Sequence, residues 1–223
     1  MKLALLLSGG KDSLYSGYLA KKHGHEITCV ISVVSKNKES YMFHTPSISL
    51  TEKQAQVMRV PIIIQKSTGK KELELKDLEN AMGYAKNKYE VEGVITGAIQ
   101  SVYQSSRIQK ICNKLKLECF NPLWQTDEKE YLNDLIKNKF SVILTGIFAY
   151  PLNQSWLGRK IDKKFISDIS QLNKKYKVSL AGEGGEYETF VLNCPLFKKE
   201  LKVKSFKDVD EGENGGRREV EIR

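Results

Sequence analysis

The chain has 223 residues, 40% of them hydrophobic and 28% charged, and its 36 Lys and Arg against 27 Asp and Glu give a formal net charge of +9. This composition is ordinary for a soluble globular protein, and the length allows one large domain or two small ones with buried cores. No apolar stretch approaches the roughly 18 residues of a membrane span, and the N-terminus leads straight into a strand pattern rather than a signal peptide. We therefore expect a cytoplasmic protein that uses no membrane.

The cysteines and the net charge bear on the compartment of the protein and on the kind of partner it binds. The chain has no C-x-x-C pair, and Cys29 and Cys112 fall in apolar patterns, which is typical of buried free thiols in a reducing compartment. The excess of positive charge fits an acidic partner such as ATP, RNA or a ribosome-associated protein. The lysines are scattered, however, with no aromatic residues between them, which favours a solvated surface and argues against nucleic acid as the substrate.

The N-terminal stretch is the most informative one. A short apolar run at residues 3–7 predicts a buried strand, and residues 14–19 show the i,i+4 spacing of a helix. The turn between them reads Ser8, Gly9, Gly10, Lys11, Asp12, Ser13. The N-terminus of a helix attracts anions, the glycines let the backbone approach a phosphate, and the hydroxyls and the ammonium add donors. This turn is therefore predicted to bind phosphate.

Asp12 needs a separate explanation, because a carboxylate beside a phosphate repels it. It fits as a ligand of Mg²⁺ or as a residue that orients the turn. The S-G-G-x-D-S pattern also differs from the G-x-x-x-x-G-K-[ST] loop of kinases and GTPases. It resembles the PP-loop of the ATP pyrophosphatases, enzymes that split ATP into AMP and pyrophosphate.

Strand and helix patterns alternate as far as residue 121. Strands are expected at residues 27–34, 60–64, 91–97 and 118–121, and helices from a capping box at Ser49 to Met58, at 71–88 and at 105–117. Such alternation predicts a parallel sheet with helices on both faces. The loop at 35–46 would lie at the carboxyl edge of the sheet and could cover a nucleotide base, with His44 at the ligand or in a structural bond.

A linker is expected at residues 122–126, where Thr126 would cap a helix with an acidic first turn. Beyond it, strands are expected at 141–150, 190–192, 200–203 and 218–222, a helix at 162–176 and a further segment at 178–181. We therefore expect two domains, at residues 1–123 and 124–223.

A second candidate group follows the strand at 91–97. Gly97 and Ala98 are small enough for a ribose or a phosphate to pass close to the backbone. Ser101 and Arg107 supply donors, and Arg107 could clamp an α-phosphate or a substrate carboxylate. The group should lie at the same sheet edge as the SGGKDS turn, although an ordinary polar helix start would look the same.

A third group, near the C-terminus, is acidic. Glu183, Glu186 and Glu188 stand among three glycines in an otherwise basic chain, and the last two would share one face of an extended segment. Clustered carboxylates repel one another unless a cation or a proton lies between them. The cluster therefore indicates a site for Mg²⁺, ammonium or a cationic substrate group, with an exposed acidic hairpin as the alternative.

Together, SGGKDS at 8–13, GAIQSVYQSSR at 97–107 and GEGGEYETFV at 182–191 resemble the diphthine–ammonia ligase family over nearly the whole chain. The resemblance implies a PP-loop ATP-binding domain at 1–123, with the Rossmann-like adenine nucleotide α-hydrolase fold, and a smaller α+β domain at 124–223 that recognises the substrate. It implies ATP and Mg²⁺, the latter at Asp12, and as partners ammonium and elongation factor 2 carrying diphthine. The oligomeric state stays open, with a homodimer as one option.

The implied reaction converts diphthine into diphthamide through an acyl-adenylate, with release of AMP and pyrophosphate. The implied catalytic residues are Asp12, Ser101, Arg107, Glu183, Glu186 and Glu188. The glutamates would bind ammonium, take its proton or hold the trimethylammonium group of diphthine, and the sequence leaves these three roles open. With no glutaminase-like Cys/His arrangement in view, free ammonium is the expected nitrogen source.

Two other functions stay open at this point. A tRNA-modifying PP-loop enzyme, a thiolase or a lysidine-type ligase, would explain the positive charge, although such thiolases commonly use C-x-x-C pairs. A nucleotide-binding sensor without catalysis would keep the SGGKDS turn but has no use for the glutamates.

Overall fold

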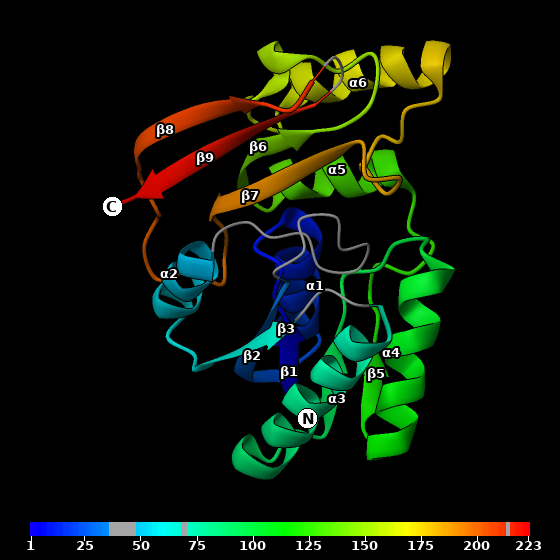
Figure 1. The fold of residues 1–223 in the computed structure, drawn as a ribbon, viewed down its shortest axis with the longest axis vertical. Helices are drawn as coiled ribbons and strands as arrows, with labels where there is room; N and C mark the ends of the chain where they lie inside the picture. Colours follow the sequence, from blue (N-terminus) through cyan, green and yellow to red (C-terminus); the bar gives the residue numbers. More distant parts are fainter. Residues whose placement is uncertain (36–47, 68–70, 213–214) are drawn as a thin grey trace. The chain divides into compact units, whose positions relative to one another are not determined.

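The fold is described from a computed structural model, in which residues 1–35, 48–67, 71–212 and 215–223 are described. The chain divides into two compact units, Met1–Trp124 and Gln125–Arg223. Each unit has its own sheet (Figure 1). Among the described residues, no helix combines the length and the apolar character needed to cross a membrane. The loop predicted to cover a nucleotide base, with His44, lies outside the described residues.

The first unit is built on a five-stranded parallel sheet with strand order β3-β2-β1-β4-β5. Its strands are β1 (Lys2–Leu6), β2 (Glu26–Ser35), β3 (Ile62–Ser67), β4 (Gly93–Ile95) and β5 (Glu118–Phe120). The helices between them are α1 (Lys11–Lys22), α2 (Ile48–Met58), α3 (Lys71–Tyr89) and α4 (Val102–Leu115). The expected Rossmann-like parallel sheet is confirmed.

The strand order decides where a ligand can reach the sheet. From β1 the chain moves outward through β2 to β3, then returns past β1 to β4 and β5. Right-handed crossovers therefore place α1 and α2 on one face and α3 and α4 on the other. The loops after β1 and β4 diverge at this reversal, which is where open α/β sheets bind ligands.

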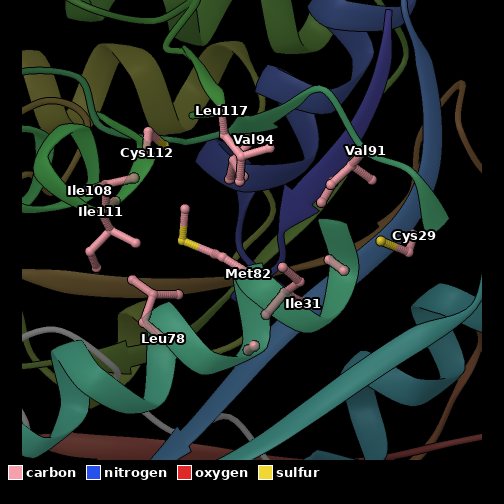
Figure 2. Packing of buried hydrophobic residues seen from close by; sticks show 13 residues of the cluster. Cys29, Ile31, Leu78, Met82, Val91, Val94, Ile108, Ile111, Cys112 and Leu117 are labelled. Atoms are coloured by element: carbon pink, nitrogen blue, oxygen red, sulfur yellow. The ribbon is translucent and has the colours of Figure 1, made fainter. Parts of the chain in front are cut away.

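One core cluster packs α3 and α4 against the sheet (Figure 2). Leu78 and Met82 of α3 meet Ile108 and Cys112 of α4, with Ile31 of β2 in the same cluster. The helix positions follow the i, i+3, i+4 spacing of an apolar helix face, which is why the pattern predicted these helices. Burial of this face fixes α4, and with it the loop that leads from β4 into α4.

The second unit is α+β, with a four-stranded antiparallel sheet of strand order β7-β6-β9-β8. Its elements are α5 (Glu128–Lys137), β6 (Ser141–Ile147), the 3-10 turn η1 (Gln154–Trp156), α6 (Lys163–Tyr176), β7 (Tyr187–Asn193), β8 (Val203–Asp210) and β9 (Gly216–Ile222). The aromatic rings of Trp156 and Phe165 pack edge to face in its core, with centroids 5.6 Å apart. The expected α+β C-terminal part is confirmed.

Several local predictions were wrong. Ser49 lies inside α2 rather than at its cap, and Asp127, not Thr126, caps α5, since its carboxylate accepts the Glu130 N–H at 2.8 Å. Helix α4 begins before residue 105, because the Ser101 side chain caps it. Strand β8 spans Val203–Asp210 rather than 200–203.

Candidate functional site

The SGGKDS loop (residues 8–13) joins β1 to α1 and is tied together by its own serines. The Ser13 hydroxyl donates to the Gly10 carbonyl at 3.1 Å and lies 3.2 Å from the Ser8 hydroxyl. Gly9 has φ +89°, a left-handed conformation that favours glycine. Gly10 is the N-cap of α1 and contributes no side-chain oxygen to the first turn. A helix end built in this way suits an external anion.

Lys11 lies inside the unit rather than on its surface. The residue is only 2% exposed, and its ammonium is 2.9 Å from the Asp12 carboxylate, whose side chain is 30% exposed. Burial of an ammonium is costly unless it is paired, so Asp12 stabilises Lys11 in place. Asp12 therefore has a structural partner in addition to any ligand it holds.

The loop after β4 lies directly against the SGGKDS loop, as predicted for two loops at one sheet edge. A β-carbon added to Gly97 would stand 2.8 Å from the Ser13 amide nitrogen and 2.9 Å from the Asp12 carbonyl carbon. Only glycine allows this approach between two backbones. Ala98 is buried, and its N–H donates to the Thr96 hydroxyl at 3.4 Å.

A glutamine that the sequence analysis missed also holds the SGGKDS loop. Gln54 of α2 is fully buried, and its side-chain amide donates to the Gly9 carbonyl at 3.0 Å. The available signal was a polar residue at an inward position of the helix, next to Ala55 and four residues after Leu50.

Ser101 and Arg107 both have partners within α4. The Ser101 hydroxyl oxygen accepts the Gln104 N–H at 3.3 Å, which makes it the N-cap of the helix. Arg107 lies over the Tyr103 ring, with its guanidinium carbon 3.4 Å from the centroid, and donates to the Tyr103 carbonyl at 3.3 Å. Both residues are half-buried, and both lie on the element that follows Gly97.

The three glutamates near the C-terminus belong to what we call the glutamate turn (residues 179–188). Its backbone is held from outside the turn by Glu128 in the first turn of α5. The Glu128 carboxylate accepts the Leu180 N–H at 2.7 Å, the Ala181 N–H at 3.1 Å and the Ser179 hydroxyl at 3.0 Å. The Tyr187 hydroxyl adds a hydrogen bond to the Leu180 carbonyl at 2.6 Å.

Glu186 and Glu188 have different partners within the unit. Glu188 lies 3.2 Å from the Arg217 guanidinium, and Glu186 Oε1 accepts the Ser179 N–H at 2.8 Å. Within the described residues, the other oxygen of Glu186 is buried and has no hydrogen-bond partner. The Glu183 N–H donates to the Ser179 hydroxyl oxygen at 3.1 Å. Over the described part of the chain, no group of three or more His, Cys, Asp or Glu residues could hold a metal ion.

Arg217, the cation beside Glu188, was not foreseen. It comes from β9, bonds Glu211 at 3.0 Å and stacks on Phe148 with its guanidinium carbon 4.6 Å from the ring centroid. Because β9 pairs with β6, and β6 with β7, the antiparallel sheet brings Arg217 and Glu188 together.

Most backbone N–H groups at the start of the glutamate turn already have acceptors, which limits what the turn can offer a ligand. Five of its backbone N–H groups donate to acceptors within the unit, those of Ser179, Leu180, Ala181, Glu183 and Gly185. Because these donors are engaged, the turn presents mainly its carboxylates to a ligand. Such a surface suits a cation or a hydrogen-bond donor.

Comparison with known proteins covers both units. The family model described as "Diphthamide synthase N-terminal domain" matches residues 1–119, and the one described as "Diphthamide synthase C-terminal domain" matches residues 127–220. Curated proteins named "Diphthine--ammonia ligase" from Bos taurus and Homo sapiens are each 34% identical over 92% of this chain and 84% of their own length. A protein of the same name from Schizosaccharomyces pombe is 32% identical over 96% of this chain and 38% of its own length.

A solved chain described as a predicted subunit of tRNA methyltransferase from Methanocaldococcus jannaschii aligns with 90% of this chain and 99% of its own. Its identity is 18% and its TM-score 0.46, a likeness that supports no functional conclusion.

Proposed function

This chain belongs to the diphthamide synthase family, and on that premise we propose that it is a diphthine–ammonia ligase. It would use ATP and ammonium to convert the carboxyl group of diphthine on elongation factor 2 into the amide of diphthamide. The matches to both family models and the relatives named for this activity support the proposal over a tRNA-modifying enzyme or a non-catalytic sensor.

The close approach of Gly97 to the SGGKDS loop is the observation that supports ATP binding by this chain. It joins the loops after β1 and β4 into one cradle at the point where the strand order reverses. We propose that the triphosphate of ATP binds there, on Ser8, Gly9, Gly10, Lys11, Asp12, Ser13, Gly97 and Ala98. Residues 1–123 would thus be the ATP-binding domain, and residues 124–223 would recognise the substrate.

The proposed chemistry has two steps. A carboxylate resists ammonia because its leaving group would be oxide. Its oxygen therefore attacks the α-phosphorus of ATP, and the bond from that phosphorus to the β-phosphate oxygen breaks, which releases pyrophosphate. Neutral ammonia then attacks the acyl carbon, loses a proton and expels AMP. Donors held in advance around the phosphates, as in this loop, stabilise the charge that develops.

A divalent cation fits this loop only together with the nucleotide. Asp12 is the one carboxylate of the loop, and Mg²⁺ is commonly held by one or two carboxylates plus substrate phosphates. The Asp12 side chain is 30% exposed and paired with Lys11, so it could supply one oxygen to the cation. Bound Mg²⁺ would neutralise the charge of the departing pyrophosphate.

Ser101 and Arg107 are proposed to contact the adenylate. The Ser101 oxygen accepts the Gln104 N–H, and its own hydrogen remains able to donate to a ligand. In the structure, a cation–π contact holds the Arg107 guanidinium on the Tyr103 ring. To reach a phosphate, the guanidinium would have to leave this ring.

Glu183, Glu186 and Glu188 are proposed to serve the second step, as binders of ammonium, as acceptors of its proton or as holders of the substrate cation. The partners would be elongation factor 2 and ammonium in the cytoplasm. Because Glu188 is paired with Arg217, whereas one buried oxygen of Glu186 has no hydrogen-bond partner among the described residues, Glu186 is a stronger candidate than Glu188 for an external cation.

The test is to analyse nucleotide products after incubation of ATP, ammonium and diphthine-bearing elongation factor 2 with the protein. AMP release should require the complete mixture, pyrophosphate release should require ATP and the elongation factor and should continue through repeated turnovers only with ammonium, and Ser13→Ala should form little of either. ADP as the product, or AMP formation that ignores the elongation factor, would contradict the proposal.

A further inference from the structure

The contact between Glu128 and the glutamate turn has the geometry of an occupied anion site. The N–H groups of Leu180 and Ala181 are consecutive, and both donate to the same oxygen of Glu128. Gly182, the next residue, has φ +72° and so turns the chain in the left-handed conformation. Successive backbone N–H groups in a turn conformation form a concave nest for anions. Here the chain fills that nest with its own carboxylate.

The filling carboxylate comes from a distant part of the chain. Glu128 begins α5, whereas the nest lies between α6 and β7. Glu128 also accepts the Ser179 hydroxyl, whose oxygen in turn accepts the Glu183 N–H. The Ser179 N–H donates to Glu186 Oε1. One carboxylate therefore fixes the backbone from which both Glu183 and Glu186 extend.

We propose that Glu128 is a positioning residue of the glutamate turn that converts an anion-binding nest into a cation-binding surface. It does so in two ways, by occupying the donors and by adding a negative charge. Its bearing on the reaction rests on the proposed function, in which the turn handles ammonium or the substrate cation. Glu128 itself touches no reactant in this scheme.

The chain offers a matched control on the same helix turn. Glu130 carries the same charge two residues later and is exposed, so Glu130→Gln removes a charge without emptying the nest. Glu128→Ala empties the nest completely. Glu128→Gln keeps a carbonyl oxygen that can accept both N–H groups, but it loses the negative charge and the second carboxylate oxygen, so it should give an intermediate result. It also serves as the test variant if Glu128→Ala fails to fold.

The first measurement needs no catalysis. Amide exchange and a sulfate titration, both followed by NMR on the full chain, report directly on Leu180 and Ala181. In Glu128→Ala the two amides should exchange about tenfold faster or more, and added sulfate should shift their resonances. In the wild-type protein and in Glu130→Gln, neither change should occur. Unaltered exchange, or a sulfate response equal to that of the wild type, would overturn the proposal.

The second measurement separates positioning from general structural support. Amide formation should show a KM for ammonium raised roughly tenfold in Glu128→Ala and less in Glu128→Gln, with the KM for ATP unchanged. If the Leu180 and Ala181 amides exchange faster in Glu128→Ala but its KM for ammonium is unchanged, the role of Glu128 in the reaction is overturned. A wild-type protein that forms no amide would refute the proposed function instead, and the exchange and sulfate results would then decide on Glu128 alone.

Discussion

Gly97 and Ser13 lie so close that a β-carbon on residue 97 would stand 2.8 Å from the Ser13 amide nitrogen. Real β-carbons do not approach backbone atoms so closely, so Gly97→Ala must push the SGGKDS loop away from β4. Overpacking of this kind costs about 1–3 kcal/mol, and here the displaced atoms belong to the proposed phosphate site. We expect ATP affinity, measured by calorimetry, to fall roughly tenfold or more.

The control for this change is Gly83→Ala in α3. There the nearest atom to the added β-carbon is Leu115 Cδ2 at 3.9 Å, an ordinary contact. Alanine is favoured over glycine inside a helix by roughly 0.5–1 kcal/mol, so this variant should melt at a higher temperature and bind ATP normally. Equal ATP affinity in Gly97→Ala and Gly83→Ala would show that the close approach has no role in binding.

Gln54 should matter for ATP binding although it lies on another helix. Removing its side-chain amide in Gln54→Ala leaves the Gly9 carbonyl without this donor and opens a cavity beside the loop. ATP affinity should drop, and stability should fall by about 1–3 kcal/mol. Gln56→Ala, at an exposed position of the same helix, should change neither. Normal ATP binding by a folded Gln54→Ala protein would exclude the positioning role.

Glu188 and Glu186 should respond differently to removal of their charges. Glu188→Gln breaks the ion pair with Arg217, whose two side chains are 20% and 25% exposed, and should cost about 1–2 kcal/mol of stability. Glu186→Gln keeps an oxygen that accepts the Ser179 N–H. It also removes the negative charge of a carboxylate whose other oxygen is buried without a partner among the described residues, so stability should hold or rise. Denaturant unfolding of both variants measures this contrast, and a reversed order of stabilities would contradict it.

The thiols should react in an order set by their surroundings. Burial raises the pKa of Cys29 to about 11 and that of Cys194 to about 12, so both stay protonated near neutral pH. A hydrogen bond from Cys112 lowers the pKa of the half-buried Cys119, which increases its thiolate fraction, and raises the pKa of Cys112. Iodoacetamide at about pH 8 should therefore alkylate Cys119 first.

Mass spectrometry of peptides after timed alkylation checks this order, with the denatured chain as the reference in which all four thiols react. Early modification of Cys194 in the folded protein would show that it is less protected than its burial indicates. The expectation that Cys29 and Cys112 are buried free thiols is confirmed.

The parts of the fold that rest on local signals could be predicted from the sequence. The apolar run before the SGGKDS turn predicted β1, and an apolar helix face predicted α3. Both signals are local, because each segment buries its own apolar residues. The meeting of Gly97 with the SGGKDS loop was predicted as well, since parallel strands place their carboxyl ends at one edge. The cap at Ser101 also had a local signal, because Ser101 and Gln104 have capping-box spacing.

The contacts that organise the glutamate turn could not be predicted in this way. Glu128 meets the turn across more than one intervening element, and Arg217 reaches Glu188 only because β9 joins the sheet beside β6. Neither contact has a sequence period or a spacing, since both depend on strand order and on helix docking. The different partners of Glu186 and Glu188 could not be read from their spacing either.

The proposed reaction joins ammonium to the carboxyl group of diphthine. Its most direct test is incubation of diphthine-bearing elongation factor 2 with the protein, ATP and isotopically labelled ammonium, followed by mass spectrometry of the modified peptide. The label should enter the side-chain amide in proportion to the AMP released, and only when ATP is present. AMP formation without label in the amide, or no label under any condition, would contradict it.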